Sequence, residues 1–242
     1  MNRRWNRRAL LGAATAAGAG ALASGGLVRA GGGAAPAGGK HHDPGAHGDH
    51  GAMMTVGEVN HARNGFDPHA ILTDWDAGEV STLPDGRRLR EYAITAVDQE
   101  IEVAPGVFFP AWSYNGRVPG PTLRATEGDV IRIRFANGGT HRHSMHFHGI
   151  HAARMDGVPG AGDIAPGEVF VYEFEARPFG CHLYHCHSLP LKRHIHKGLY
   201  GAFIIDPDPE LHPEQREVAR SRLLGTPENA RWQELVMVMN GF

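Results

Sequence analysis

Cysteine is scarce in this chain of 242 residues, which contains only Cys181 and Cys186. Both lie in one short segment, where a disulfide across a single strand is geometrically awkward. The sequence therefore excludes a fold that several disulfides hold together. The cysteine count gives no information about the redox compartment.

An excess of charge of one sign is also absent. The chain has 24 Lys and Arg residues against 26 Asp and Glu residues, for a formal net charge of −2, and no long basic run lies beyond the N-terminal leader. This balance indicates no nucleic-acid partner. The weakly apolar stretch near the N-terminus is too short and too rich in glycine to make a good membrane span. We therefore predict neither nucleic-acid binding nor a membrane span.

The N-terminal segment has the features of an export signal. Arg7 and Arg8 precede a weakly apolar run of Ala and Gly, as in signals for twin-arginine export. We predict a twin-arginine signal peptide over residues 1–30, with an open cleavage site and a periplasmic or secreted destination. The alternative is an unstructured tail in which the arginines pair by chance.

Residues 31–56 have the composition of a linker, rich in Gly and Ala with interspersed His and Met. Such a segment buries too little apolar surface to fold alone. Imidazole and thioether groups both bind copper, so the segment is either a solvated spacer or a weak copper-capturing linker. We expect residues 57–90, whose pattern is irregular, to form an N-terminal arm that packs against the following domain.

Strand signals dominate from residue 91 onward. The runs with an alternating or β-rich pattern are 91–97, 100–103, 107–114, 130–135, 169–174 and 199–205. Turn signals of Gly, Pro and Asn separate these runs, and no long amphipathic helix occurs before about residue 209. Short strands between such turns predict an all-β fold, either an antiparallel sandwich or a barrel.

The 17 histidines direct attention to metal binding, because histidine is the commonest metal ligand. Two segments, 143–148 and 185–187, stand out. Side chains two positions apart share one face of a strand. If both segments are extended, four histidines converge on the outward face, namely His146, His148, His185 and His187. The inward set is His143 and Cys186, joined by His194 from the loop after the strand.

These ligand types favour copper. One thiolate with two imidazoles is the trigonal set of a blue-copper centre, and imidazoles also suit further copper ions. Structural zinc sites usually show paired cysteines, whereas only Cys186 is central here. With Cys186 on one copper and its chain neighbours His185 and His187 on others, an electron would cross between centres through a few bonds.

The sequence resembles the cupredoxin domain of multicopper oxidases that carries the type 1 copper, as in two-domain laccase-like oxidases. The matching motifs are His-x-x-His-x-His from residue 143, His-Cys-His from residue 185, and the His194 and Leu199 that follow. Segments 114–122, 155–159 and 166–184 extend the resemblance over roughly residues 91–207. It implies a cupredoxin-like Greek-key β-sandwich over 91–207, with copper as cofactor.

The resemblance also implies a role for each ligand. The type 1 copper would be held by His143, Cys186 and His194, with Leu199 in the axial position. The trinuclear type 2 and type 3 cluster would be held by His146 at the type 2 copper and by His148, His185 and His187 at the type 3 pair. The family builds this cluster from four His-x-His units in two domains, whereas this chain supplies two units.

Several nearby residues lie outside the matching motif positions. His196 is an alternative ligand to His194, although the spacing to Leu199 favours His194. We expect His141, His151 and His182 to be surface or supporting residues. Cys181 has the strand parity of the outward histidines, and a packed thiol is the expectation there.

The cluster needs ligands from elsewhere. Residues 208–242 have the pattern of a linker followed by a strand-like ending, which resembles the start of a missing second domain. The resemblance implies either such a second cupredoxin domain or a homotrimer in which neighbouring chains complete the cluster. Dioxygen and a reducing substrate are the implied partners.

Three functions follow from this pattern. The first is a multicopper oxidase that reduces dioxygen to water. The second is a copper nitrite reductase, for which His143 and His148 have suitable spacing but His146 and His187 have no role. The third is a single-domain copper electron-transfer protein.

Overall fold

The computed structural model describes residues 57–215 and 234–242. The predicted signal peptide (1–30) and the His/Gly-rich linker (31–56) lie outside these residues, as does most of the predicted C-terminal linker. In the described part, no helix has both the length and the apolar character needed to cross a membrane.

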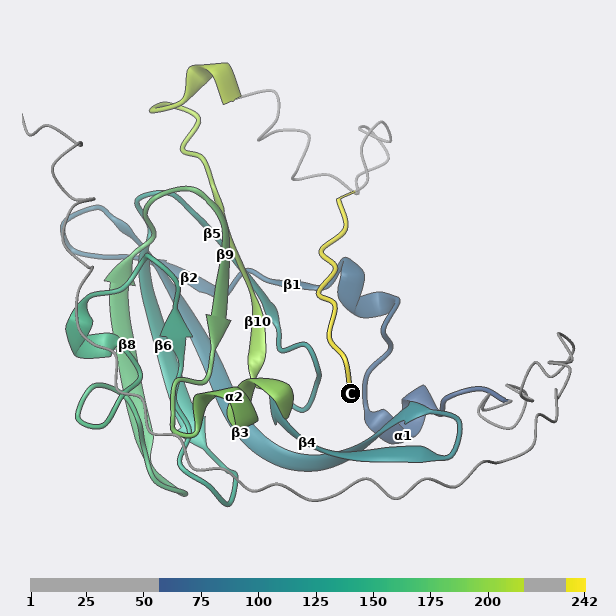
Figure 1. Cartoon of the computed structure of the whole chain (residues 1–242). Coiled ribbons are helices and arrows are strands. Elements are labelled where there is room, and N and C mark those ends of the chain that lie inside the picture. Colours follow the sequence, from purple (N-terminus) through teal and green to yellow (C-terminus); the bar gives the residue numbers. More distant parts are fainter. Residues whose placement is uncertain (1–56, 216–233) are drawn as a thin grey trace, which may run out of the picture. The chain divides into compact units, whose positions relative to one another are not determined.

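Within the described residues, ten strands form two sheets (Figure 1). The first sheet has the order β1 (Trp75–Asp76), β5 (Thr122–Thr126), β10 (Tyr200–Asp206), β9 (Gly180–His185) and β7 (His146–Phe147). The second has the order β2 (Glu79–Thr82), β3 (Arg88–Ala104), β6 (Val130–Asn137) and β8 (Val169–Glu175), and β4 (Val107–Tyr114) pairs with β3.

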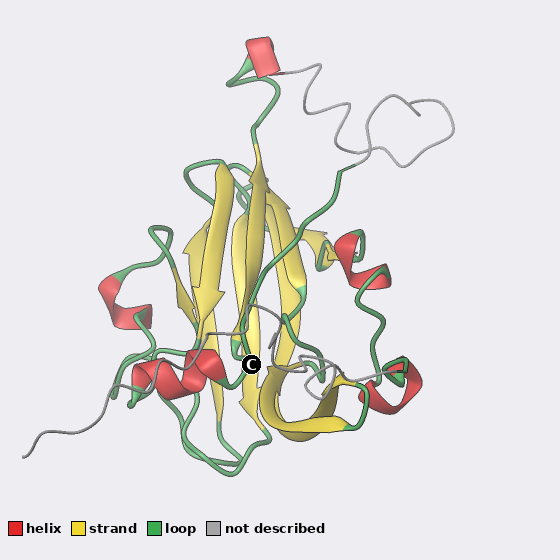
Figure 2. Ribbon diagram, turned by 45° about the vertical axis from the view of Figure 1, so that its right-hand side comes forward, coloured by secondary structure: helices red, strands yellow, loops and turns green. Residues whose placement is uncertain are grey.

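The helices of the described residues are short and lie outside the sheets (Figure 2). They are α1 (His61–Asn64), α2 (Leu191–His196) and the 3-10 turns η2 (Ala70–Leu72), η3 (Ala153–Met155) and η4 (Pro213–Gln215). From β4 to β9 the chain changes sheet at every strand. The β3–β6, β5–β10 and β1–β5 pairs are parallel, so the sheets are mixed and not purely antiparallel as the turn pattern predicted.

The main hydrophobic core lies between the two sheets. It combines Ile131 and Phe135 of β6 with Leu123 of β5 and Phe203 of β10, all without exposed surface. Strands β6 and β8 alternate buried and more exposed positions, as expected for strands with one face on a core. The all-β, cupredoxin-like sandwich predicted from the sequence is confirmed.

Individual strands differ from the sequence pattern where burial does not alternate. The two predicted runs 91–97 and 100–103 form one continuous strand, β3. Strand β5 is buried at four successive positions and β2 is exposed at all four, so neither shows the period of two that reveals a strand. The region predicted as an irregular arm therefore contains β1 and β2.

The C-terminal segment also differs from its sequence pattern, because residues 234–242 form no strand. This segment contacts the domain at separate points. Glu234 pairs with Arg124 at 3.1 Å, the Val236 amide donates to the Leu72 carbonyl at 2.9 Å, and the Phe242 ring packs on Phe109. These side-chain contacts and this backbone hydrogen bond, and no ladder, connect the segment to the domain.

Tyr114 links the core to the segment that carries the first histidine motif. Its buried hydroxyl donates to the Ser144 carbonyl at 2.6 Å. We expect Tyr114→Phe to lower the free energy of unfolding by about 1–3 kcal/mol in urea denaturation, because a buried carbonyl loses its donor. Tyr200→Phe is the control, since Tyr200 is only partly buried and its loss should be smaller. Equal losses would contradict this account.

Candidate metal centre

An inner cluster of His143, Cys186 and His194 lies inside the domain. His143 precedes β7, Cys186 directly follows β9, and His194 lies on α2. All three are buried, with exposed fractions of 0%, 0% and 3%. The structure therefore brings together three residues that are up to 51 positions apart in the sequence.

The three side chains point their donor atoms at one another. The Nδ1 atoms of His143 and His194 are 3.2 Å apart, and the Cys186 Sγ lies 3.9 Å from the first and 3.3 Å from the second. Lone pairs that face each other in a buried space need a proton or a cation between them. One sulfur and two nitrogens in a triangle fit the trigonal site of a blue copper.

The electrostatics of the inner cluster also suits a cation. Burial lowers the pKa of His143 to about 4 and also lowers the pKa of His194, so both imidazoles are neutral near pH 7 and can coordinate metal. Burial raises the pKa of the Cys186 thiol, while hydrogen bonds from Ser188 and Ser144 lower it. A bound metal cation would favour the thiolate outright.

The structure distinguishes between the two candidate histidines of α2. His194 faces Cys186, whereas His196 is exposed and lines a surface pocket. Leu199 is fully buried in the same hydrophobic cluster as Cys186. Its carbonyl accepts from the Cys186 amide at 3.0 Å, and its amide donates to the His194 carbonyl at 3.3 Å. Leu199 thus closes the loop that carries two of the three donors.

The four outward histidines form a second cluster at the same end of β7 and β9. His146 and His185 are directly opposite in the β7–β9 ladder. The Nε2 atoms of His148 and His185 are 2.8 Å apart, and the rings of His146 and His187 lie 4.4 Å apart. His148 is exposed and the other three are partly buried, so this cluster is open to the surface.

Backbone carbonyls orient three of these imidazoles. The Asp156 carbonyl is 3.0 Å from His146 Nδ1 and 2.8 Å from His187 Nδ1, and the Cys186 carbonyl is 2.9 Å from His185 Nδ1. Each Nδ1–H can donate to its carbonyl, which leaves Nε2 with a free lone pair. Such hydrogen bonds fix the tautomer of metal-ligating histidines. Burial lowers the pKa of His185 to about 4 and also lowers that of His146.

Sequence reasoning assigned no role to Asp156, which supports this second cluster. Its carboxylate Oδ1 lies 3.0 Å from His146 Nδ1 and 3.8 Å from His151 Nε2. Gly157 has φ of +80°, and a Cβ there would lie 2.7 Å from the Met145 carbonyl, so only glycine allows this close approach. Segment 155–159 belongs to the family resemblance, but nothing in its sequence indicated the contact with the histidines.

The remaining nearby residues are distributed as follows. His151 packs on His146 with ring centroids 4.6 Å apart, so it supports that residue. His141 stacks on Trp112, and the His182 Nδ1 lies 3.2 Å from the His148 carbonyl. The expectation for Cys181 was wrong, because its thiol is exposed rather than packed. Cys181 lies near the start of β9, opposite Ile204 of β10.

Substitution of the two α2 histidines distinguishes the inner ligand. We expect His194→Ala to abolish the intense thiolate-to-copper absorption of the copper(II)-loaded protein, because the trigonal set loses a donor. His196→Ala on the same helix is the matched control and should retain the band. Visible absorption spectroscopy measures both, and the opposite pattern would assign the ligand to His196.

Comparisons with known proteins place this geometry in a family. Residues 96–210 match the family model for multicopper oxidases. The chain is 38% identical over 138 residues to a copper resistance protein A homolog of Pseudomonas syringae pv. tomato. This match covers 55% of this chain and 23% of that protein. The chain is also 32% identical over 123 residues to a copper-containing nitrite reductase of Neisseria meningitidis. That match covers 50% of this chain and 31% of the enzyme.

A solved multicopper oxidase structure is similar with a TM-score of 0.60 and 62% sequence identity, over 62% of this chain and 53% of that chain. The chain therefore spans only about a quarter to a half of the length of these relatives. The family match, the similar structure and the sandwich fold agree. Residues 96–210 form a multicopper oxidase cupredoxin domain, with copper as its cofactor.

Proposed function

We propose that this protein is a laccase-like multicopper oxidase that transfers electrons from a reductant to dioxygen. The observation that carries the proposal is the position of Cys186 between His185 and His187. Its thiol faces the inner cluster, while its two neighbours belong to the outer cluster. Copper would supply one-electron redox chemistry at the inner cluster and reduction of dioxygen to water at the outer one.

The inner cluster would hold the type 1 copper. His143, Cys186 and His194 supply the donors, and Leu199 occupies the axial position without a donor atom. The buried Ser144 amide donates to the Cys186 sulfur at 3.4 Å. The chain thus holds the thiolate and excludes water from it.

The outer cluster would be one half of the trinuclear site. His146 is assigned to the type 2 copper, and His148, His185 and His187 to the type 3 pair. These four histidines face outward and His148 is exposed, so the cluster is accessible to ligands from outside this domain. A second cupredoxin domain or a neighbouring chain in a homotrimer would provide them.

The reductant would reach the inner cluster from the side of α2. A pocket of about 520 Å³ lies there and combines aromatic with basic side chains. Its lining residues are Phe109, Pro190, Lys192, Arg193, His196, Lys197, Gly241 and Phe242. Arg193 and Lys197 also contact Trp112, whose ring packs on His194 with centroids 4.8 Å apart.

The proposed location is the periplasm or the cell exterior. The paired arginines of the leader support export by the twin-arginine route, which carries folded proteins and so suits a chain with bound copper. Blocking that route should leave the protein in the cytoplasm with its leader uncleaved.

Two variants separate the proposed clusters. Cys186→Ser should abolish both the blue absorption and dioxygen uptake, because the thiolate is lost. His148→Ala should keep the blue absorption but abolish dioxygen uptake, because only the exposed outer cluster changes. Visible spectroscopy and an oxygen electrode, with the copper-loaded protein and an artificial reductant, measure both outcomes.

The unaltered protein provides the decisive comparison for this pair. A blue protein that consumes no dioxygen in its assembled form would overturn the oxidase proposal and favour an electron carrier. Conversion of nitrite to nitric oxide would favour a nitrite reductase, as the similarity to the Neisseria meningitidis enzyme allows. That function, however, leaves the ordered tautomers of His146 and His187 without a role.

Leu199→Met tests the axial position. A thioether there would add a weak donor that stabilises the cupric state, so we expect a lower reduction potential. Redox titration of the blue absorption measures the shift. An unchanged or higher potential would remove Leu199 from the axial position.

A further inference from the structure

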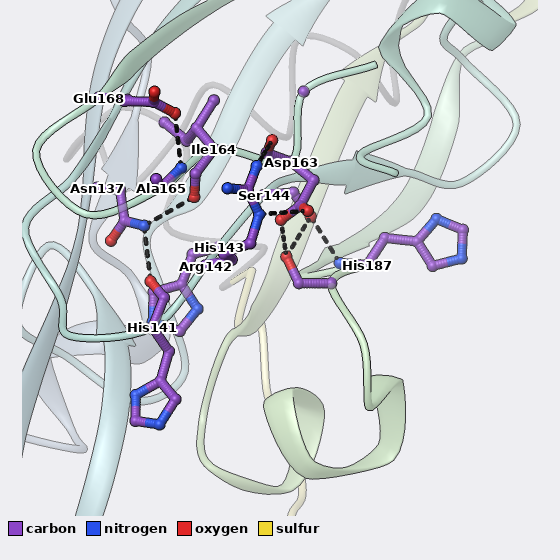
Figure 3. Close-up of polar contacts among 12 residues, drawn as sticks. Asn137, His141, Arg142, His143, Ser144, Asp163, Ile164, Ala165, Glu168 and His187 are labelled. Carbon is purple, nitrogen blue, oxygen red and sulfur yellow. Dashed lines mark hydrogen bonds and ion pairs between the residues drawn. The ribbon is translucent and has the colours of Figure 1, made fainter. Parts of the chain in front are cut away.

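A buried polar network extends from the inner cluster to the protein surface. The Ser144 hydroxyl lies 3.8 Å from the Cys186 sulfur and 3.4 Å from the Ser188 hydroxyl. The Ser188 hydroxyl in turn donates to Asp163 Oδ1 at 2.7 Å. Figure 3 shows Asp163 beside Ser144 and His187, on the loop that precedes β8. Three contacts therefore separate this carboxylate from the thiol.

The Ser188 hydroxyl of this network has a defined direction. Ser188 has one hydroxyl proton, and its shortest contact directs that proton to Asp163. The Ser144 oxygen accepts the His187 amide at 2.9 Å, so its own proton is free for Ser188 or for the Cys186 sulfur. Asp163 therefore holds the orientation of Ser188 next to the proposed copper site.

Asp163 carries a buried charge with one counterion. Its side chain is 5% exposed, and Arg142 Nε donates to its Oδ2 at 2.9 Å. Arg142 Nη2 also donates to the Asp163 carbonyl at 2.6 Å, and Figure 3 shows this fork. The Arg142 side chain is 53% exposed, so water screens the positive partner more than the negative one.

The backbone fixes this ion pair next to a proposed copper ligand. His143 and Ile164 exchange two backbone hydrogen bonds, of 3.1 and 3.0 Å. The field of the carboxylate also reaches both imidazoles. Burial lowers the pKa of His143 and of His194, and the charge of Asp163 acts in the opposite direction on each.

We propose that the Asp163–Arg142 ion pair sets the reduction potential of the copper held by His143, Cys186 and His194. This inference rests on the proposed type 1 site. A nearby negative charge stabilises the cupric state more than the cuprous state, because the cupric site carries one more positive charge. A one-electron reduction moves no ligand or proton in this scheme, so the whole effect appears in the potential.

Charge-neutralising variants of the copper-loaded protein test the inference. Redox titration of the blue absorption should give a higher midpoint potential for Asp163→Asn and a lower one for Arg142→Gln. Glu168→Gln is the matched control, because it neutralises a carboxylate of the same loop that contacts the Ala165 amide instead of the network. Its potential should equal that of the unaltered protein.

Opposite shifts from the two partners would not arise from a purely structural role, which predicts similar damage from either substitution. Should Asp163→Asn fail to fold, substitution of the half-exposed Arg142 side chain by Gln still tests the predicted direction of the shift in potential. An intact blue band with unchanged potentials in both variants, or with shifts equal to that of Glu168→Gln, would overturn this inference but leave the type 1 site in place. A missing blue band in the unaltered protein would overturn the type 1 site as well.

Discussion

The register between β7 and β9 is the constraint on which both candidate copper clusters depend. His146 lies opposite His185, and Phe147 lies opposite Tyr184. This register directs Phe147 and Tyr184 into the core and the two histidines outward. A slip of one residue would reverse every side chain of β7 and would place an imidazole in the aromatic core. The hydrophobic effect on two rings thus holds the positions of the proposed metal ligands.

Much of the fold and of the site was predictable from local sequence signals. Strand β4 begins and ends where its β-rich pattern does. The alternation of His185, Cys186 and His187 predicts which side chains share a face, and the structure gathers the donors accordingly. A period of two is a property of extended backbone itself and needs no knowledge of its neighbours. It therefore indicates the facing sides of residues 185–187, although only His185 lies within β9.

The rest depends on contacts between distant segments, which no local pattern records. Strand β5 is buried at four successive positions and hence lacks a period, and β2 pairs with β3 although all its side chains are exposed. Asp163 and Ser188 are 25 positions apart and ordinary in their local sequence. Only the three-dimensional structure shows that their side chains meet beside Cys186.

The difference in burial between the two clusters has a consequence for metal exchange. Water and small chelators cannot approach the inner donors without an opening of the α2 loop, whereas the imidazole of His148 is already in contact with solvent. Ions bound at the two places would therefore exchange through different kinetic routes. One domain would then combine a centre that exchanges metal slowly with one that exchanges it rapidly. Coverage by a second domain or chain would decide how long the rapidly exchanging centre keeps its metal.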